Sequence, residues 1–407
     1  MPIKYGKDTV KKKLQISFLP SLYIITVISL TLGQFTSIYK NEGANVYLYD
    51  FLIFLFAFVG FLILLSKKSF RIPLHLILFF PFTGWALISI ILQFPKLNTS
   101  DWLVSFSYLI RLATYLLSAT VIFNLIKQKY VSLRFLKISI VFAGLVVAIL
   151  GFIQLVVLPD FTVLDKALGW DPHKNRLAST FFDPNFVGGF LSICLGVILG
   201  GFYSLKENLQ KKFFILSLPI ILLGIFLTFS RSSWAMAGII FMIFGMFRSK
   251  KILLGAVLIV FSAYFFVPRV QTRITGVTDP ADSAHFRLAS WKNAIEISKD
   301  NLLFGVGFNT FRYYQKDFGF FEPGLFGGNS GAGTDSSFLL ILATTGIAGL
   351  VLFVSAYFLN ILRNFNVSDP NKLMIFAILI GLFVHSQFVN SLFYPQIMYF
   401  FTILLVL

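Results

Sequence analysis

The sequence predicts an all-α polytopic membrane protein with about twelve transmembrane helices, and three observations carry this prediction. Hydrophobic residues make up 57% of the 407-residue chain, and charged residues make up only 13%. The apolar residues form successive runs close to the roughly 20 residues that a helix needs to cross a bilayer. Short clusters of Lys and Arg separate these runs, so the net charge of +17 sets membrane orientation and does not indicate nucleic-acid binding.

The expected spans follow one another along the whole chain. In order they cover residues 17–38, 48–65, 73–94, 102–126, 135–158, 186–204, 213–228, 232–247, 253–267, 337–359, 373–390 and 395–407. The seventh and eighth meet at Ser230 and Arg231 and form either a tight hairpin or two half-helices. The chain therefore divides into residues 1–267 with nine spans, an extracytoplasmic loop at 268–336, and residues 337–407 with three spans.

Charge fixes the expected orientation. Basic residues stand at the N-terminus and in alternate loops near 67–71, 127–137, 206–212, 248–251 and 363–372, whereas the first two loops on the other side hold Lys40 and Lys96. Cytoplasmic loops of membrane proteins carry this excess of Lys and Arg. We therefore place the N-terminus in the cytoplasm. The first apolar run lacks a small-residue cleavage site, so we expect no cleaved signal peptide.

Two extracytoplasmic segments, 159–185 and 268–336, are too long to be simple turns, and long connections are usually functional. Within the second, residues 285–300 are expected to form a helix that rests on the mouth of the bundle through Leu288, Trp291 and Ile295. The glycine-rich stretch at 319–333 is expected to be mobile or a plain linker.

Three arginines stand near the outer ends of spans: Arg176, Arg231 and Arg287. Guanidinium groups bind phosphate oxygens through paired hydrogen bonds, so together they would suit a pyrophosphate whose lipid lies in the bilayer. The alternative is that they reach to lipid headgroups. Arg111 lies in the middle of a span and needs either a partner or a water-filled cavity, and the sequence does not distinguish these.

Asp335 ends the long outer loop, where a carboxylate can take a proton from an attacking sugar hydroxyl. It can equally cap the following helix, and both roles are compatible if Ser336 makes the cap. Around Pro184, Asp183 and Asn185 are interpreted first as a turn and cap and second as substrate contacts.

Further candidate substrate contacts are Ser230, Ser336 and His385, the last lying within the eleventh span near its outer end. Neither a zinc motif nor a Walker A motif is present, so no metal and no cofactor are expected. Gly305-Val306-Gly307 lacks the rest of a dinucleotide fingerprint and is interpreted as a turn.

These residues together resemble the O-antigen ligase and O-antigen polymerase superfamily of bacterial envelope enzymes. The resemblance covers most of the chain: the many spans, the large loop between spans nine and ten, and a series of motifs in a fairly specific order. The motifs are Arg176 with Thr180, Asp183 and Asn185; Thr228-Phe229-Ser230-Arg231-Ser232; Arg287 with Trp291; Gly305-Val306-Gly307; and Asp335-Ser336-Ser337-Phe338-Leu339 followed by Thr345-Gly346-Ile347-Ala348-Gly349-Leu350.

The resemblance implies a metal-independent, inverting, GT-C-like glycosyltransferase of the bacterial inner membrane whose active face is extracytoplasmic. The donor would be a glycan on undecaprenyl pyrophosphate, and the acceptor a glycan, lipid A-core or a protein. Ligases usually carry a histidine where this chain has Asp335 and an asparagine where it has Ser336. A polymerase is therefore at least as well supported as a ligase.

Two other classes of function stay open at this point. One is a transporter or flippase of a lipid-linked glycan or small anion, which should show paired broken helices that the sequence does not reveal. The other is a non-catalytic envelope assembly factor whose arginines contact only lipid headgroups.

Overall fold

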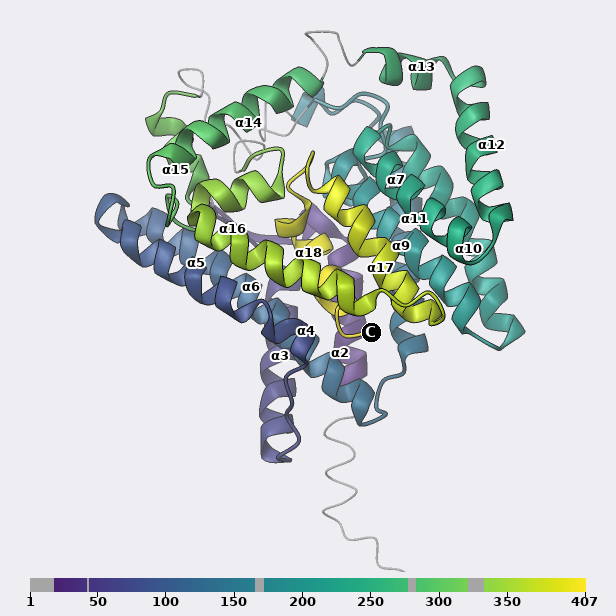
Figure 1. Ribbon diagram of the computed structural model, residues 1–407, viewed down its shortest axis with the longest axis horizontal. Helices are drawn as coiled ribbons and strands as arrows, with labels where there is room; N and C mark the ends of the chain where they lie inside the picture. Colours follow the sequence, from purple (N-terminus) through teal and green to yellow (C-terminus); the bar gives the residue numbers. More distant parts are fainter. Residues whose placement is uncertain (1–17, 42–43, 165–171, 277–282, 321–332) are drawn as a thin grey trace, which may run out of the picture.

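The computed structural model describes residues 18–41, 44–164, 172–276, 283–320 and 333–407, and these are overwhelmingly helical (Figure 1). The longer helices are α2 (Leu19–Thr31), α3 (Leu48–Ser66), α5 (Phe80–Gln93), α6 (Thr99–Lys127), α7 (Leu133–Val157), α9 (Pro184–Ser204), α10 (Asn208–Leu227), α11 (Arg231–Phe247), α12 (Lys250–Phe266), α14 (Ser283–Lys299), α16 (Ser337–Asn364), α17 (Pro370–His385) and α18 (Pro395–Leu404). Shorter elements are α4 (Leu74–Ile77), α13 (Pro268–Thr275), α15 (Phe311–Asp317), the 3-10 turns η1 (Gly33–Thr36), η2 (Phe94–Lys96), η3 (Ser179–Phe181) and η6 (Ser391–Phe393), and the strands β1 (Ser37–Asn41) and β2 (Ala44–Tyr47).

The all-α polytopic class is confirmed, whereas the number of twelve spans stays a prediction. Within the described chain, seven helices are long and apolar enough to cross a membrane, and α12 with α13 adds an eighth if the bent pair is one span. Shorter apolar helices stand at the other four predicted positions: α2, α11, α17 and α18. The ten residues of α18 reach only about 15 Å, half the thickness of the hydrocarbon core.

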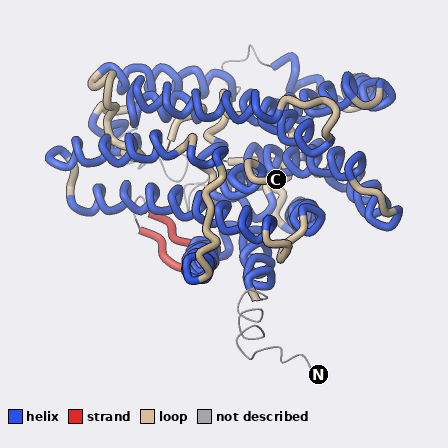
Figure 2. Tube along the Cα trace, turned by 60° about the horizontal axis from the view of Figure 1, so that its bottom comes forward, coloured by secondary structure: helices blue, strands red, loops and turns tan. Residues whose placement is uncertain are grey.

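The first predicted span, 17–38, is wrong in its second half. Helix α2 ends at Thr31, and the chain continues through η1 into an antiparallel hairpin of β1 and β2 (Figure 2). The change of direction occurs at Gly33, whose φ is +51° and where a Cβ atom would lie 2.4 Å from the carbonyl oxygen of Thr180. The Thr180 hydroxyl also donates to the Thr31 carbonyl at 2.6 Å, so the loop between α7 and α9 closes over this helix end.

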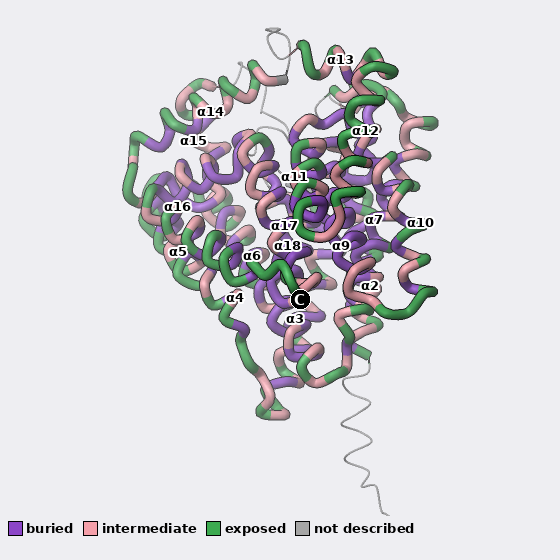
Figure 3. Tube along the Cα trace, turned by 45° about the vertical axis from the view of Figure 1, so that its right-hand side comes forward, coloured by how far each residue is buried: buried purple, intermediate pink, exposed green. Residues whose placement is uncertain are grey.

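Helix α9 is the centre of the bundle, buried along almost its whole length (Figure 3). It packs against α7, α10, α11 and α17. Glycines make this close approach possible, because Cβ atoms at Gly196 and Gly200 would overlap Ile378 and Met374 of α17. The start of α9 is the point at which the first outer loop enters the core.

The segment that is predicted to be the second extracytoplasmic loop contains, in its described residues, the helices α13, α14 and α15, which lie along one edge of the bundle (Figure 1). The helix predicted at 285–300 is confirmed as α14, and of its three predicted contact residues Trp291 touches the bundle, at the Asp335 carbonyl and the Phe388 ring. Leu288 and Ile295 are exposed, while Ala294 and Ile297 are buried against α16. The expectation failed for Leu288 and Ile295 because it gave most weight to large apolar residues. A small residue, Ala294, makes the close contact with α16 instead. Most of the glycine-rich stretch lies outside the described residues.

The outer segment is also inserted into α16. The backbone N–H groups of Val306 and Gly307 donate to the carbonyls of Ala343 and Thr344, both at 2.9 Å, and the Ile347 N–H donates to the Leu302 carbonyl at 2.8 Å. Gly305 and Gly346 have φ of +72° and +68°, and a Cβ on either would overlap the backbone of the other segment. The two glycine motifs of the sequence thus form one junction, and residues 305–307 are a bent segment between the turns at 301–304 and 308–309 and not themselves a turn.

Arg111 proves to have a partner. Its Nε and Nη2 donate to the two carboxylate oxygens of Asp50 at 2.9 and 2.7 Å, and Nη2 also donates to the Asn45 carbonyl at 2.8 Å. The Tyr115 hydroxyl donates to the same carboxylate at 2.9 Å, and Tyr108 lies under the guanidinium. This bidentate pair joins α3 to α6, so the charge is compensated within the fold.

Candidate active site at the arginine cluster

Arg176 lies in the outer loop between α7 and α9, and its side chain is buried against the end of α10. Nε donates to the Thr228 carbonyl at 2.8 Å, and Nη2 donates to Oδ1 of Asn185 at 3.3 Å. Nη1 lies 3.4 Å from Nδ1 of His173. The acceptors that Arg176 contacts in the described chain are therefore neutral, and its own positive charge stays uncompensated by an ion pair there.

The turn at 228–230 separates α10 from α11, so a short connection joins the helices at the predicted positions of spans seven and eight. Ser230 occupies the N-cap position of α11, and its hydroxyl donates to Oδ1 of Asn185 at 2.8 Å. The same Asn185 oxygen thus accepts from Arg176 and from Ser230. Two sequence motifs that are more than forty residues apart meet at this one amide.

Arg231 is the first residue of α11 and extends toward α13. Its Nη1 donates to the carbonyl oxygen of Arg273 at 3.1 Å. One turn earlier on α13, Arg269 donates to the carbonyls of Lys174 and Asn175 and lies over the Phe229 ring at 4.2 Å. Helix α13 is thereby bound to both the first outer loop and the start of α11.

Arg269, Arg273 and Arg287 lie close enough to act on Arg176 electrostatically, and Arg231 joins this group through the Arg273 carbonyl. Burial lowers the pKa of Arg176 to about 9, and the positive charges of Arg273, Arg287 and Arg269 lower that pKa further, while Asp183 acts in the opposite direction. The group stays protonated at neutral pH. We call Arg176, Arg231, Arg269, Arg273 and Arg287 the arginine cluster. Several buried and half-buried guanidinium groups in one region are suited to an anionic ligand.

Asp183 sits at the inner edge of the arginine cluster as the N-cap of α9. Its carboxylate accepts hydrogen bonds from the backbone N–H groups of Asn185 and Phe186, at 2.6 and 3.4 Å. Burial raises the pKa of Asp183, whereas those backbone donors and the charge of Arg176 lower it. The first interpretation of Asp183 as a cap is confirmed, and a substrate contact stays a prediction.

His385 is fully buried at the end of α17 and continues the same network inward. Its Nε2 lies 3.3 Å from the hydroxyl of Ser233, and its Nδ1 lies 2.6 Å from the hydroxyl of Ser391. Ser233 in turn donates to Ser230 at 3.0 Å. Glycines in α9 make the room, because a Cβ on Gly188 would overlap Ser233 and one on Gly189 would lie 2.8 Å from the His385 ring.

Asp335 lies beside α14, directly before α16. Its backbone N–H donates to the hydroxyl of Ser290 at 3.0 Å, and its carbonyl accepts from Nε1 of Trp291 at 3.1 Å. Arg287 precedes these two residues by three and four positions, so it lies on the same face of α14. Ser336 is the N-cap of α16 and accepts from the Leu339 N–H at 3.3 Å. The cap is thus made by Ser336, and the Asp335 carboxylate is not needed for it.

The structure brings the predicted residues to one region, but sequence reasoning missed several members. Arg269 and Arg273 were part of an outer loop without an assigned element, although their four-residue spacing directly after Pro268 indicates one helix face. Ser233 and Ser391 were missed because a buried serine gives no signal until its partner is known. Ser230, Ser336 and His385 are buried, so any contact they make with a substrate requires that the substrate enter the network.

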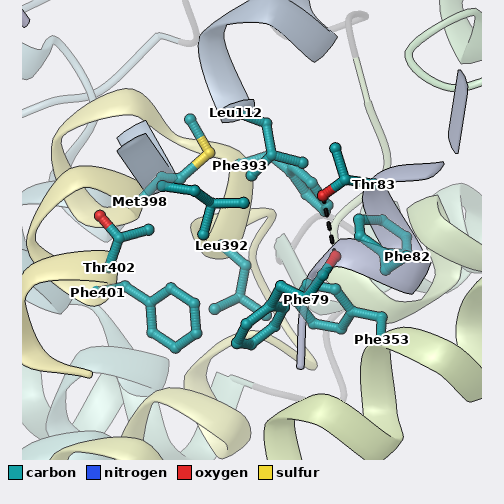
Figure 4. Close-up of a pocket in the computed structure, with 11 residues that line it drawn as sticks. Phe79, Phe82, Thr83, Leu112, Phe353, Leu392, Phe393, Met398, Phe401 and Thr402 are labelled. Carbon is teal, nitrogen blue, oxygen red and sulfur yellow. Dashed lines mark hydrogen bonds between the residues drawn. The ribbon is translucent and has the colours of Figure 1, made fainter. Parts of the chain in front are cut away.

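A separate cavity lies inside the bundle between α5, α6, α16 and the C-terminal segment (Figure 4). It is lined by Phe79, Phe82, Thr83, Leu112, Leu116, Phe353, Leu392, Phe393, Met398, Phe401 and Thr402. The Thr83 hydroxyl is bonded to the Phe79 carbonyl at 2.9 Å, so this apolar cavity offers little polar chemistry. None of the arginine cluster lines it. Among the described residues, His, Cys, Asp and Glu side chains form no group able to hold a metal ion.

Comparison with known proteins agrees with this arrangement. The family model described as O-antigen ligase matches residues 213–354, a segment that runs from α10 to the middle of α16 and includes Arg231, Arg287 and Asp335. No curated protein matches the chain. The match and the many apolar helices point to a multi-pass inner-membrane protein. The match over residues 213–354 thus supports the resemblance of this chain to the O-antigen ligase and O-antigen polymerase superfamily.

Proposed function

We propose that the protein transfers or polymerises a glycan from an undecaprenyl-pyrophosphate donor onto an acceptor hydroxyl at the outer face of the inner membrane. The observation that carries the proposal is the convergence of Arg176, Arg231 and Arg287 from three separate motifs. Arg176 and Arg287 act on each other electrostatically, and Arg231 reaches the same cluster through the backbone of Arg273.

The arginine cluster supplies the charge that this reaction needs. As the bond between the anomeric carbon and the pyrophosphate breaks, negative charge develops on the departing phosphate oxygen. Guanidinium groups that are held in place before the reaction stabilise that charge without needing to reorganise. Arg176 is held by Thr228 and Asn185, and Arg231 is held by α13.

In the proposed step, the acceptor hydroxyl oxygen attacks the anomeric carbon from the side opposite the pyrophosphate, so the configuration inverts. One C–O bond forms, the C–O bond to the pyrophosphate breaks, and the hydroxyl proton passes to the Asp335 carboxylate. Asp335 is the candidate base because Ser336 makes the helix cap and because Ser290 and Trp291 hold the Asp335 backbone. The lipid pyrophosphate leaves with both electrons of the broken bond.

The proposed reaction has three variants, which differ in the molecule that carries the acceptor hydroxyl. An Asp335-Ser336 pair in place of the His-Asn pair usual in ligases favours a glycan acceptor, and hence a polymerase, at least as much as lipid A-core. A protein acceptor is the third variant. Each of them uses the same donor site, so the arginine cluster does not discriminate among them.

The test is transfer by the purified protein in nanodiscs, with lipid-linked oligosaccharide as donor and product length or acceptor mass as the readout. We expect Asp335→Asn to lower the transfer rate about 10²- to 10⁴-fold, the range for loss of a general base. Asp317→Asn is the matched control, because it makes the same change at an exposed carboxylate at the end of α15, outside the arginine cluster, and it should leave transfer within about twofold.

Three outcomes would contradict the proposal in different ways. Normal transfer by Asp335→Asn would remove Asp335 as the base and leave the arginine cluster in place. Movement of intact donor across the bilayer without covalent change would identify a flippase. Neither transfer nor movement, with the donor bound or not, would favour a non-catalytic envelope role.

A further inference from the structure

Helix α12 differs from the other apolar helices in being held at its two ends and uncovered in its middle. At the N-terminal end of α12, Leu253 packs directly against Gly245 of α11. At the far end the chain bends by 96° into α13, and α13 is bound to α11 and the outer loop through Arg231 and Arg269. No residue of α12 is buried.

The middle of α12 is exposed on every side. Residues 257–262 are six consecutive exposed positions (Figure 3). Successive residues of an α-helix differ by about 100° in direction, so six of them cover the full circle, including the side that faces the bundle. Five of the six are Val, Leu, Ile or Phe. An apolar space therefore separates this part of α12 from its neighbours.

The neighbouring helix α11 offers a matching surface below Arg231. Its buried residues, such as Met236 and Ile240, face α9 and α17. Ala235, Gly238, Met242 and Met246 are exposed and lie four, seven, eleven and fifteen residues after Arg231, which places them on the same face as that arginine. A Cβ atom on Gly238 would meet nothing within 4 Å. Because Ala235 and Gly238 have small side chains or none, they leave the space between α11 and the middle of α12 unfilled.

We propose that the space between α11 and the middle of α12 holds the isoprenoid chain of the lipid pyrophosphate donor. This inference rests on the proposed function. The chemistry of the ligand follows from charge complementarity. The apolar space between α11 and α12, which we call the slot, ends at Arg231, Arg269 and Arg273. A ligand that fits it has a long apolar chain with an anionic group at one end. The pyrophosphate binds the arginine cluster, and the chain runs along Ala235 and Gly238 between the two helices.

The test compares two donors that carry the same glycan, one with a full-length isoprenoid chain and one with a short, water-soluble chain. Gly238→Trp fills the slot, and we expect it to raise KM for the long donor about tenfold, equivalent to about 1.4 kcal/mol, while KM for the short donor changes less than about twofold. Gly84→Trp is the matched control, because Gly84 of α5 is also exposed with nothing within 4 Å of a Cβ and belongs to another part of the surface.

Failure of the slot and failure of the proposed function give different results. If unmodified protein transfers from neither donor, the proposed function fails. If unmodified protein transfers normally but Gly238→Trp behaves like Gly84→Trp, or impairs both donors equally, the slot assignment is overturned.

A second measurement needs no variant. A donor with a diazirine in its isoprenoid chain should label α11 and α12 of the unmodified protein, and unlabelled donor should suppress that labelling. If a diazirine phospholipid labels the same residues and excess donor does not displace it, the space holds ordinary bilayer lipid and the proposal is wrong.

Discussion

Arg111 and Arg176 are both buried arginines, and the comparison between them separates a structural charge from a functional one. Arg111 faces the two oxygens of Asp50, and the Tyr115 hydroxyl completes the site. Arg176 donates to neutral oxygens and is surrounded by further arginines, with Asp183 as the opposing charge nearby. A guanidinium paired with a carboxylate holds helices together, whereas a buried guanidinium whose acceptors in the described chain are neutral, as at Arg176, is suited to an anionic ligand.

The largest expected effect tests the arginine cluster on which the proposed function rests. Arg231→Ala should lower kcat/KM for glycan transfer about 10³-fold, or about 4 kcal/mol, because it removes charge from the departing pyrophosphate. Its thermal unfolding should be unchanged. Arg231→Lys is the control, since it keeps the charge without the paired geometry and should be intermediate. Activity of Arg231→Ala within about threefold of the unmodified protein would mean that the cluster is not the donor site.

The Arg111–Asp50 ion pair should affect the free energy of unfolding and not the transfer kinetics. Arg111→Ala leaves the Asp50 carboxylate buried without its cation, and we expect a loss of about 3 kcal/mol in the free energy of unfolding. Unfolding in detergent, followed by limited proteolysis or thermal denaturation, measures this loss. The KM of the folded fraction should stay normal. A stable but inactive Arg111→Ala protein would place Arg111 in the functional site and remove the contrast.

A smaller effect is expected where the buried network supports the arginine cluster. Ser233→Ala breaks the connection between His385 and Ser230, which shares Asn185 with Arg176. We expect kcat/KM to fall about tenfold, or about 1.4 kcal/mol, mainly through kcat because the arginines lose their fixed positions. Ser217→Ala in α10, which removes another buried serine hydroxyl, should have no such effect. Equal kinetics for the two variants would refute the positioning role.

The smallest effect should come from replacing the whole Arg111 pair. Arg111→Met combined with Asp50→Leu removes both charges at once, and the free energy of unfolding should return to within about 1 kcal/mol of the original. Thermal denaturation of the double variant beside the two single variants gives the coupling between them. If the losses in the free energy of unfolding of the two single variants add up in the double variant, Arg111 and Asp50 do not stabilise the fold through each other.

The helices could be predicted from the sequence because a bilayer demands long apolar runs, and those runs are visible without tertiary information. The convergence of the site was also predictable, since Arg176, Arg231 and Asp335 each flank a span on the same expected side. The hairpin after Thr31 was not predictable, because its cause is the contact between Gly33 and Thr180. The pairing of Arg111 with Asp50 needed the neighbouring helix, and the contact face of α14 depended on a small residue, Ala294.

The insertion of residues 302–307 into α16 determines which part of the outer surface is held in place. Helix α14 is fastened on two sides, through Ser290 and Trp291 to Asp335 and through the paired glycines at 305 and 346 to the interrupted helix. Arg287 and Asp335 thus behave as one rigid unit. Helix α13 is joined in the described chain through Arg231 and Arg269 to α11 and to the carbonyls of Lys174 and Asn175. A substrate that enters between α13 and α14 would therefore meet Arg287 and Asp335 on a wall whose position is fixed by α16.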